Sequence, residues 1–139
     1  DEVQRGFDDA LGVVSLIHNG DRLCYGGGTA YLELASRLRS RASEVGGRGQ
    51  MAIDAFADAL EIIPSTIAEN AGHSGLDTVL AMRHEGYGYG PDVHNGGIVH
   101  MAKWRVYEPE TLVRSAITTA TEVTTAMLRI DDIIGRKEG

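Results

Sequence analysis

Three consecutive glycines at residues 26–28, followed by a helical pattern from Thr29, are the first feature that could bind a ligand. The N-terminus of a helix presents unpaired N–H groups and a positive dipole end, and glycines let an anion approach the backbone closely. A tight turn without a ligand explains the same glycines, and the spacing alone favours that interpretation. No Gly-Lys-Ser/Thr sequence follows, so this is not a Walker phosphate loop.

Two adjacent carboxylates, Asp8 and Asp9, are the second candidate. Both lie off the apolar stripe of a helical segment, a position that is typical of a solvated helix face. In a functional interpretation, one of them is a base that orients water or a ligand for a metal such as Mg²⁺. The periodicity does not choose between the two aspartates.

The other polar and reactive side chains give weaker signals. The five histidines lack the spacing of zinc ligands, so we expect no metal site. Cys24 has no histidine nearby in sequence and is interpreted as an inert thiol. The glycines at 86, 88 and 90 resemble a dinucleotide fingerprint only superficially, because no βαβ unit surrounds them. Glu108 alone indicates a carboxylate placed favourably at a helix N-terminus.

Hydrophobic periodicity predicts three helices in the first half of the chain, at about residues 2–18, 29–45 and 51–63. The third is apolar around most of its circumference, which is typical of a central helix in a bundle. Glycines at 46, 47 and 49 separate the second helix from the third. We expect Pro64 to end or kink the third helix, with the chain remaining helical to Asn70.

Capping signals predict two further helices. Ser74, with Asp77 three residues later, resembles a capping box before a short helix at residues 76–83. A long helix follows Glu108 and Pro109, since proline is accepted at a first helical position.

The strand signals are fewer. Residues 86–91 are predicted to be a loop, and Asn95-Gly96, between Val93 and Ile98, predicts a hairpin. Residues 128–134 alternate as in an extended strand. The sequence therefore predicts one mainly α domain with a small β-hairpin and a C-terminal strand.

Length and composition exclude several classes of protein. The 139 residues correspond to a single domain or part of one. A net charge of −7 argues against binding to nucleic acid and gives no reason to expect an anionic membrane surface as partner. No apolar run reaches the roughly 18 residues of a membrane span, and no signal peptide opens the chain. The single cysteine indicates a reducing cytoplasm.

Together, these segments resemble the group II chaperonins (thermosomes), and specifically the C-terminal half of their ATP-binding equatorial domain. The resemblance includes Gly26-Gly27-Gly28-x-Ala30 and Ala68-Glu69-Asn70-Ala71-Gly72. The matching blocks lie in the family's order at residues 1–14, 26–33, 50–64, 68–72, 92–93, 106–109 and 128–134.

The resemblance implies a role for particular residues. It implies that Asp9 positions or activates the water that attacks the γ-phosphate, and thereby selects Asp9 over Asp8. It implies that Gly27 and Gly28 pack against the nucleotide and that Asp92 and Val93 border the adenine. It also implies that Glu108 faces the ribose hydroxyls, a contact that suits a carboxylate because it accepts two hydrogen bonds.

The resemblance further implies that the chain is a partial domain, residues 1–139, with residues 1–10 at the junction with an intermediate domain. The family's Gly-Asp-Gly-Thr-Thr phosphate loop and its metal-binding aspartate do not occur in this sequence. ATP and Mg²⁺ are therefore expected in the intact parent, with ring-forming subunits and unfolded client proteins as its partners. The isolated chain is expected to bind no cofactor firmly, to lack ATPase activity and to self-associate.

The sequence also departs from the family near the adenine loop. Asn95-Gly96-Gly97 replaces a usual Thr-Gly-Glu, His100 replaces an acidic residue, and the stretch at 103–105 is unusual. Two alternatives stay open: a non-enzymatic helical module for oligomerisation or interaction, and a small metal protein built on the histidines.

Overall fold

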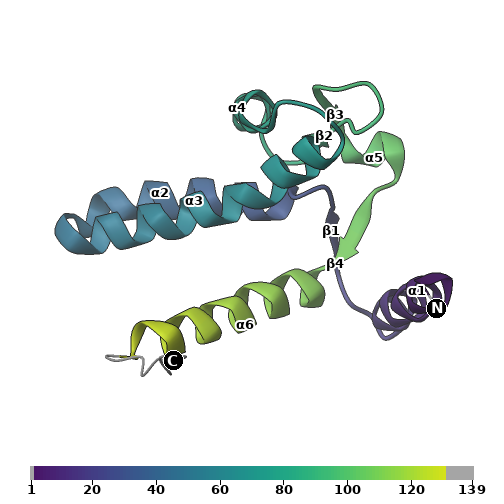
Figure 1. Ribbon diagram of the computed structural model, residues 1–139, viewed down its shortest axis with the longest axis horizontal. Coiled ribbons are helices and arrows are strands. Elements are labelled where there is room, and N and C mark those ends of the chain that lie inside the picture. The colour runs from purple at the N-terminus through teal and green to yellow at the C-terminus, as the bar shows by residue number, and fades with distance from the viewer. Residues whose placement is uncertain (1, 131–139) are drawn as a thin grey trace, which may run out of the picture.

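The computed structural model describes residues 2–130, which form six helices and four short strands (Figure 1). In chain order these are α1 (Glu2–His18), β1 (Leu23–Tyr25), α2 (Thr29–Val45), α3 (Gly47–Asn70), α4 (Gly75–Glu85), β2 (Tyr89–Pro91), β3 (Ile98–His100), α5 (Met101–Trp104), β4 (Tyr107–Pro109) and α6 (Glu110–Leu128). The mainly α fold with a small β element is as predicted.

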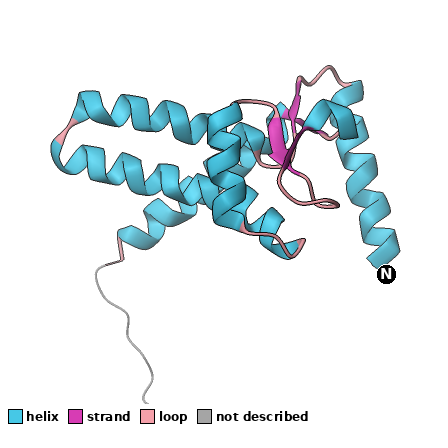
Figure 2. Ribbon diagram, turned by 90° about the horizontal axis from the view of Figure 1, so that it is seen from above, coloured by secondary structure: helices cyan, strands magenta, loops and turns pink. Residues whose placement is uncertain are grey.

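An antiparallel hairpin of α2 and α3 makes the most extensive contact between elements and extends to one side of the molecule (Figure 1, Figure 2). Ala35 and Ala57 are completely buried between the two helices, next to Leu60, so small side chains let the helices approach closely. The predicted three-glycine break is shorter than expected, because Gly46 alone separates the helices and α3 begins at Gly47. Pro64 does not end α3, which continues to Asn70.

Helix α4 packs on this hairpin and forms the second part of the core. Its N-cap is Ser74, whose hydroxyl accepts a hydrogen bond from the backbone N–H of Asp77, as the capping signal predicted. Val79 and Met82 on α4 are buried against Leu32 of α2.

Two antiparallel ribbons connect the helices. Strand β2 pairs with β3, with Gly90 opposite Val99, so the prediction that residues 86–91 form only a loop was wrong for residues 89–91. The predicted hairpin exists, but Val93 lies in its turn rather than in a strand. Strand β1 pairs with β4, placing Cys24 opposite Glu108. This second ribbon was not predicted.

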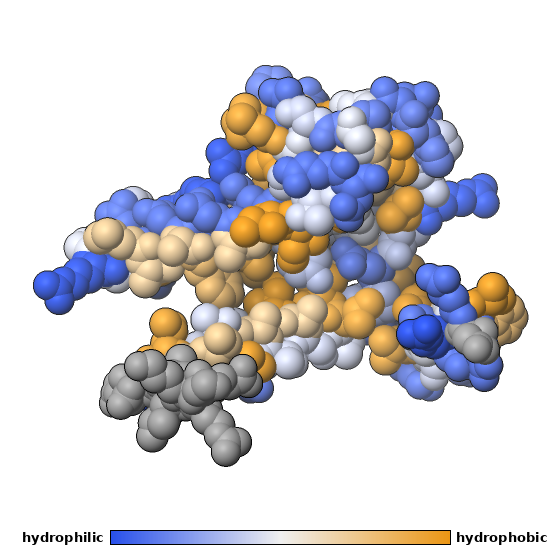
Figure 3. All heavy atoms as spheres, in the orientation of Figure 1, coloured by the Kyte–Doolittle hydropathy of each residue, from blue (hydrophilic) through white to orange (hydrophobic). Residues whose placement is uncertain are grey.

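Helices α1 and α6 leave apolar surface uncovered. None of the residues described in α1 is buried, and its stripe, which includes Phe7 at 69% and Leu11 at 56% exposure, faces away from the core. An apolar groove of about 660 Å³ lies between α6 and the α2–α3 hairpin, with Phe56 and Ile117 in its walls. Orange and tan atoms line both sides of this space in Figure 3. Leu128, the first residue of the predicted C-terminal strand, is the last residue of α6, and residues 131–134 lie outside the described residues.

Candidate functional site

The triglycine turn is a junction at which three other segments of the chain contact its backbone. Gly26 donates its N–H to the carbonyl of Val106 at 3.0 Å. A Cβ at Gly27 would lie 2.7 Å from Sδ of Met101, and one at Gly28 would lie 2.9 Å from Cβ of Pro64. Gly27 and Gly28 also have φ of +68° and +80°, values that favour glycine. Internal packing and backbone conformation therefore both require glycine here.

The three glycines differ in solvent exposure. Gly26 and Gly28 are buried, whereas Gly27 is partly exposed. A Cβ at Gly27 would also lie 3.6 Å from Cδ of Pro91, the residue before Asp92. Only Gly27 therefore offers accessible backbone in this turn, and it does so beside the loop predicted to border adenine.

Glu108 carries a carboxyl oxygen that has no partner. Its Oε1 is buried and accepts no hydrogen bond within the described part of the chain. Burial raises the pKa of Glu108 above its ordinary value. Burial likewise raises the pKa of Cys24 and of Tyr31, with the charge of Glu108 as the second cause in both. The carboxylate is thus only partly solvated and lacks a hydrogen-bond donor.

Asp92 shapes its own loop. The residue is 8% exposed, and Oδ1 accepts the backbone N–H groups of His94 and Asn95, each at 3.1 Å. Oδ2 accepts the side-chain amide of Asn95, and this bond is the main reason that the pKa of Asp92 lies below its ordinary value. Val93 is 43% exposed at the tip of the turn. The loop therefore leaves Val93 exposed while Asp92 holds the loop conformation.

Asp9 stands apart from these residues, exposed in the middle of α1. Among residues 2–130, no hydrogen bond or ion pair of its side chain is present, and the same is true of Asp8. The structure thus places Gly27 against Pro91, the residue before the Asp92–Val93 loop, and pairs β4, which contains Glu108, with β1, the strand that leads into the triglycine turn. Asp9 lies on α1, which contacts β4.

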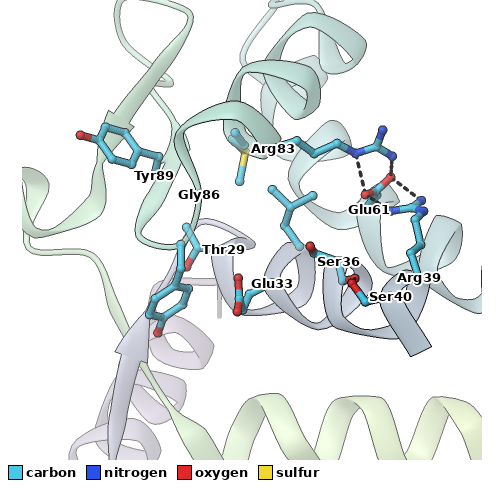
Figure 4. Close-up of a pocket in the computed structure, with 12 residues that line it drawn as sticks. Thr29, Glu33, Ser36, Arg39, Ser40, Glu61, Arg83, Gly86 and Tyr89 are labelled. Atoms are coloured by element: carbon cyan, nitrogen blue, oxygen red, sulfur yellow. Dashed lines mark hydrogen bonds and ion pairs between the residues drawn. The ribbon is translucent and has the colours of Figure 1, made fainter. Parts of the chain in front are cut away.

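A buried ion cluster was missed by the sequence analysis. Glu61 of α3 is 8% exposed and binds the guanidinium groups of Arg39 on α2 and Arg83 on α4 (Figure 4). Arg39 also reaches Asp58 at 2.6 Å. A single carboxylate within the apolar run around Leu60 was the signal that could have revealed it.

This cluster borders a cavity of about 310 Å³ that also contacts Thr29, Glu33 and Tyr89 (Figure 4). None of the six predicted site residues lines the cavity. Burial works to raise the pKa of Glu61, but hydrogen bonds from both arginines outweigh it and hold the pKa below its ordinary value. The cluster joins α2, α3 and α4, and we assign it a structural role.

Residues 2–130 contain neither a cluster of metal ligands nor a helix that could span a membrane. No group of three or more His, Cys, Asp or Glu side chains in this range is arranged to hold a metal ion. Within the same range, no helix combines the length and apolarity needed to cross a bilayer.

Fold and sequence together define the class of protein. The model of the TCP-1/cpn60 chaperonin family matches residues 1–138, and the chain therefore belongs to this family. The fold is similar to an open-state monomer of a group II chaperonin from Methanococcoides burtonii, with a TM-score of 0.72 and 38% identity. That similarity covers 78% of this chain and 28% of the other.

Particular relatives are thermosome subunits. The chain is 45% identical to thermosome subunit alpha of Halobacterium salinarum over 138 residues, which is 96% of this chain and 25% of the relative. It is also 45% identical to a thermosome subunit of Methanocaldococcus jannaschii, covering 99% of this chain and 26% of that protein. The chain thus spans about a quarter of the length of these relatives, and the resemblance to group II chaperonins is confirmed.

Proposed function

We propose that this chain works as part of an ATP-dependent group II chaperonin subunit, in which it forms one wall of the nucleotide pocket and contributes contacts to a ring. The observation that carries this proposal is the arrangement of Gly27, the Asp92–Val93 loop and Glu108 in a member of the chaperonin family. Residues 1–139 would be the C-terminal part of the equatorial domain, with residues 1–10 at its border with an intermediate domain.

The geometry at Glu108 fits a nucleoside. Among residues 2–130 the buried Oε1 has no hydrogen-bond partner, so it needs a donor, and ribose hydroxyls are donors. Gly27 offers accessible backbone in the turn after β1, the strand that pairs with β4, and Val93 has an exposed apolar side chain that could contact a base. We therefore propose Gly27, Val93 and Glu108 as contacts of the nucleotide, with Gly28 and Asp92 supporting them from buried positions.

Asp9 is proposed as the residue that orients water. Its exposed carboxylate is free of ion pairs within the described residues, so it can accept a hydrogen bond from a water molecule. Bound ATP would supply the phosphoryl group that this water attacks. The described residues hold no cluster of metal ligands, and we propose that the protein ligands of Mg²⁺ belong to polypeptide outside this chain.

We further propose that the subunit assembles with other chaperonin subunits, acts on unfolded client proteins and works in the cytoplasm. Neither nucleic acid nor a membrane is expected among its partners. The chain alone is expected to be inactive, since a phosphoryl-transfer site needs groups that bind the phosphates and the metal.

The test is a pair of substitutions in the full-length subunit. Asp9→Ala is expected to leave ATP binding largely intact and to lower steady-state turnover by about 100-fold or more, the range for loss of a positioned base. Asp8→Ala is the matched control, one residue away on the same helix, and should leave turnover within about twofold. Unchanged turnover in Asp9→Ala would remove Asp9 from this role.

A second candidate function is a non-enzymatic helical module that binds a partner. The uncovered apolar stripe of α1 and the groove beside α6 favour it, because exposed patches of this kind mark interaction surfaces. Isothermal titration of the full-length subunit with ATP separates the two candidates. Absence of any binding heat and of turnover would favour the interaction module.

A further inference from the structure

Met101 occupies an unusual position, pressed between two glycine backbones. It is 2% exposed, and its thioether lies against Gly27 of the triglycine turn on one side and Gly90 of β2 on the other. A Cβ built on Gly27 would lie 2.7 Å from Sδ, and one built on Gly90 would lie 2.9 Å from the same sulfur. The side chain therefore packs against both segments, which also approach each other directly where a Cβ at Gly27 would lie 3.6 Å from Cδ of Pro91.

The main chain of Met101 is fixed on both sides. Its N–H donates to the carbonyl of Gly88 at 2.8 Å, which ties it to the hairpin. Its carbonyl accepts the N–H of Val106 at 3.1 Å, and the carbonyl of Val106 in turn accepts the N–H of Gly26. Because the backbone is held at both ends, the thickness of the side chain sets how far apart its two neighbours lie.

These two neighbours lead to the walls of the proposed nucleotide pocket. Gly27 is the accessible backbone of the triglycine turn, and Gly90 is followed by Pro91 and by the Asp92–Val93 loop. We propose that Met101 is a positioning residue that sets the separation between the Gly27 turn and the Asp92–Val93 loop, and through it the affinity for the adenine nucleotide. The inference rests on the proposed function and adds to it a residue that touches no part of the nucleotide.

Gly90 offers a clean way to change this spacing. Its φ lies outside the positive range, so alanine at this position introduces a clash with Met101 without backbone strain. Removing the thioether in the same chain removes the clash. The pair therefore forms a double-mutant cycle in which a spacing role predicts compensation.

The experiment measures steady-state ATP hydrolysis by the full-length subunit carrying Gly90→Ala, Met101→Ala or both. Gly90→Ala is expected to raise KM for ATP about tenfold, equivalent to roughly 1.4 kcal/mol. It should leave kcat within about twofold, because Asp9 lies on a different element. Met101→Ala alone is expected to raise KM about threefold as the walls close on the cavity, and the double variant should return KM to within about threefold of the wild type.

Two controls separate spacing from stability. Met101→Leu nearly conserves volume and should keep KM near that of the wild type, whereas Gly12→Ala adds a methyl group to a glycine with no atom within 4 Å and should change nothing. Thermal unfolding of every variant shows whether a raised KM only reflects a lower melting temperature.

The possible results distinguish this inference from the function on which it rests. A lower melting temperature with unchanged KM in Gly90→Ala and Met101→Ala would make Met101 an ordinary core residue. That result would overturn this inference and leave the proposed function standing. A double variant whose KM stays as high as that of Gly90→Ala would do the same. If the wild-type subunit neither binds nor hydrolyses ATP, the proposed function fails first and this inference with it.

Discussion

Replacing Glu61 by glutamine tests whether the buried ion cluster holds α2, α3 and α4 together. The side chain of Glu61 is 10% exposed, while its partners Arg39 and Arg83 are 29% and 44% exposed. Breaking a fully buried pair costs about 3–5 kcal/mol. Here Arg39 keeps Asp58, Arg83 can turn toward water, and glutamine retains one acceptor oxygen. We therefore expect the loss of about one charge-assisted hydrogen bond, or about 2 kcal/mol of unfolding free energy.

Urea unfolding followed by circular dichroism at neutral pH measures this loss. For a chain of 139 residues, an unfolding entropy of about 2.1 cal/mol/K per residue converts 2 kcal/mol into a melting temperature lower by about 7 °C. The matched control is Glu33→Gln, which removes the exposed pair of Glu33 with Arg37 and should cost no more than about 0.5 kcal/mol. If Glu61→Gln costs as little as the control, the cluster does not hold the helices and the reasoning is refuted.

The pH dependence provides an independent check on the same cluster. The folded-state pKa of Glu61 lies below the ordinary value of 4.5, so the unfolded chain binds its proton more readily. The stabilisation is complete above about pH 4.5 and is lost as the pH falls through the lower folded-state value. The difference in unfolding free energy between wild type and Glu61→Gln should therefore shrink in this acidic window. A constant difference from pH 7 to pH 3 would contradict the assignment.

Two further predictions concern Glu108 and α1. Since burial raises the pKa of Glu108 above 4.5, its ionised form opposes folding above the raised value, and this penalty disappears as the pH falls below 4.5. Glu108→Gln should thus raise the melting temperature at pH 7 but not at pH 4. A difference in melting temperature between variant and wild type that is the same at both pH values would be inconsistent with this. The same substitution should weaken ATP binding by the full-length subunit. The 139-residue chain should self-associate at micromolar concentration in light scattering, and replacing Phe7 and Leu11 by serine should shift it toward the monomer, whereas the control Gln4→Ser should not. A monomeric wild-type chain would count against the view that the apolar stripe of α1 awaits a partner.

Most of the helices could be predicted from local sequence. Helix α2 was predicted with both ends, because glycines bound an apolar pattern of helical period. The start of α4 was predicted from Ser74, whose hydroxyl caps the helix as expected. The chain remains helical to Asn70 as predicted, and α3 continues through Pro64, where Gly28 leaves room for the buried proline ring against the start of α2.

The ribbon of β1 and β4 could not be predicted from the pattern. Each strand has three residues, too few to show an alternation, and Cys24 and its partner Glu108 are 84 positions apart. The same ribbon partly buries Glu108, whose Oε1 has no donor among residues 2–130, whereas the sequence alone indicated an ordinary carboxylate at a helix N-terminus.

The sequence by itself determined the helical class, because helical period and caps are local properties of the chain. It also carried the family resemblance, and that resemblance implied the candidate site residues. Only the tertiary structure decided that Met101 separates the Gly27 turn from Gly90 and that Glu61 lies between two arginines on neighbouring helices. These contacts depend on where distant segments pack, and differences of a few tenths of an ångström in packing distance cannot be predicted from the spacing of residues along the chain.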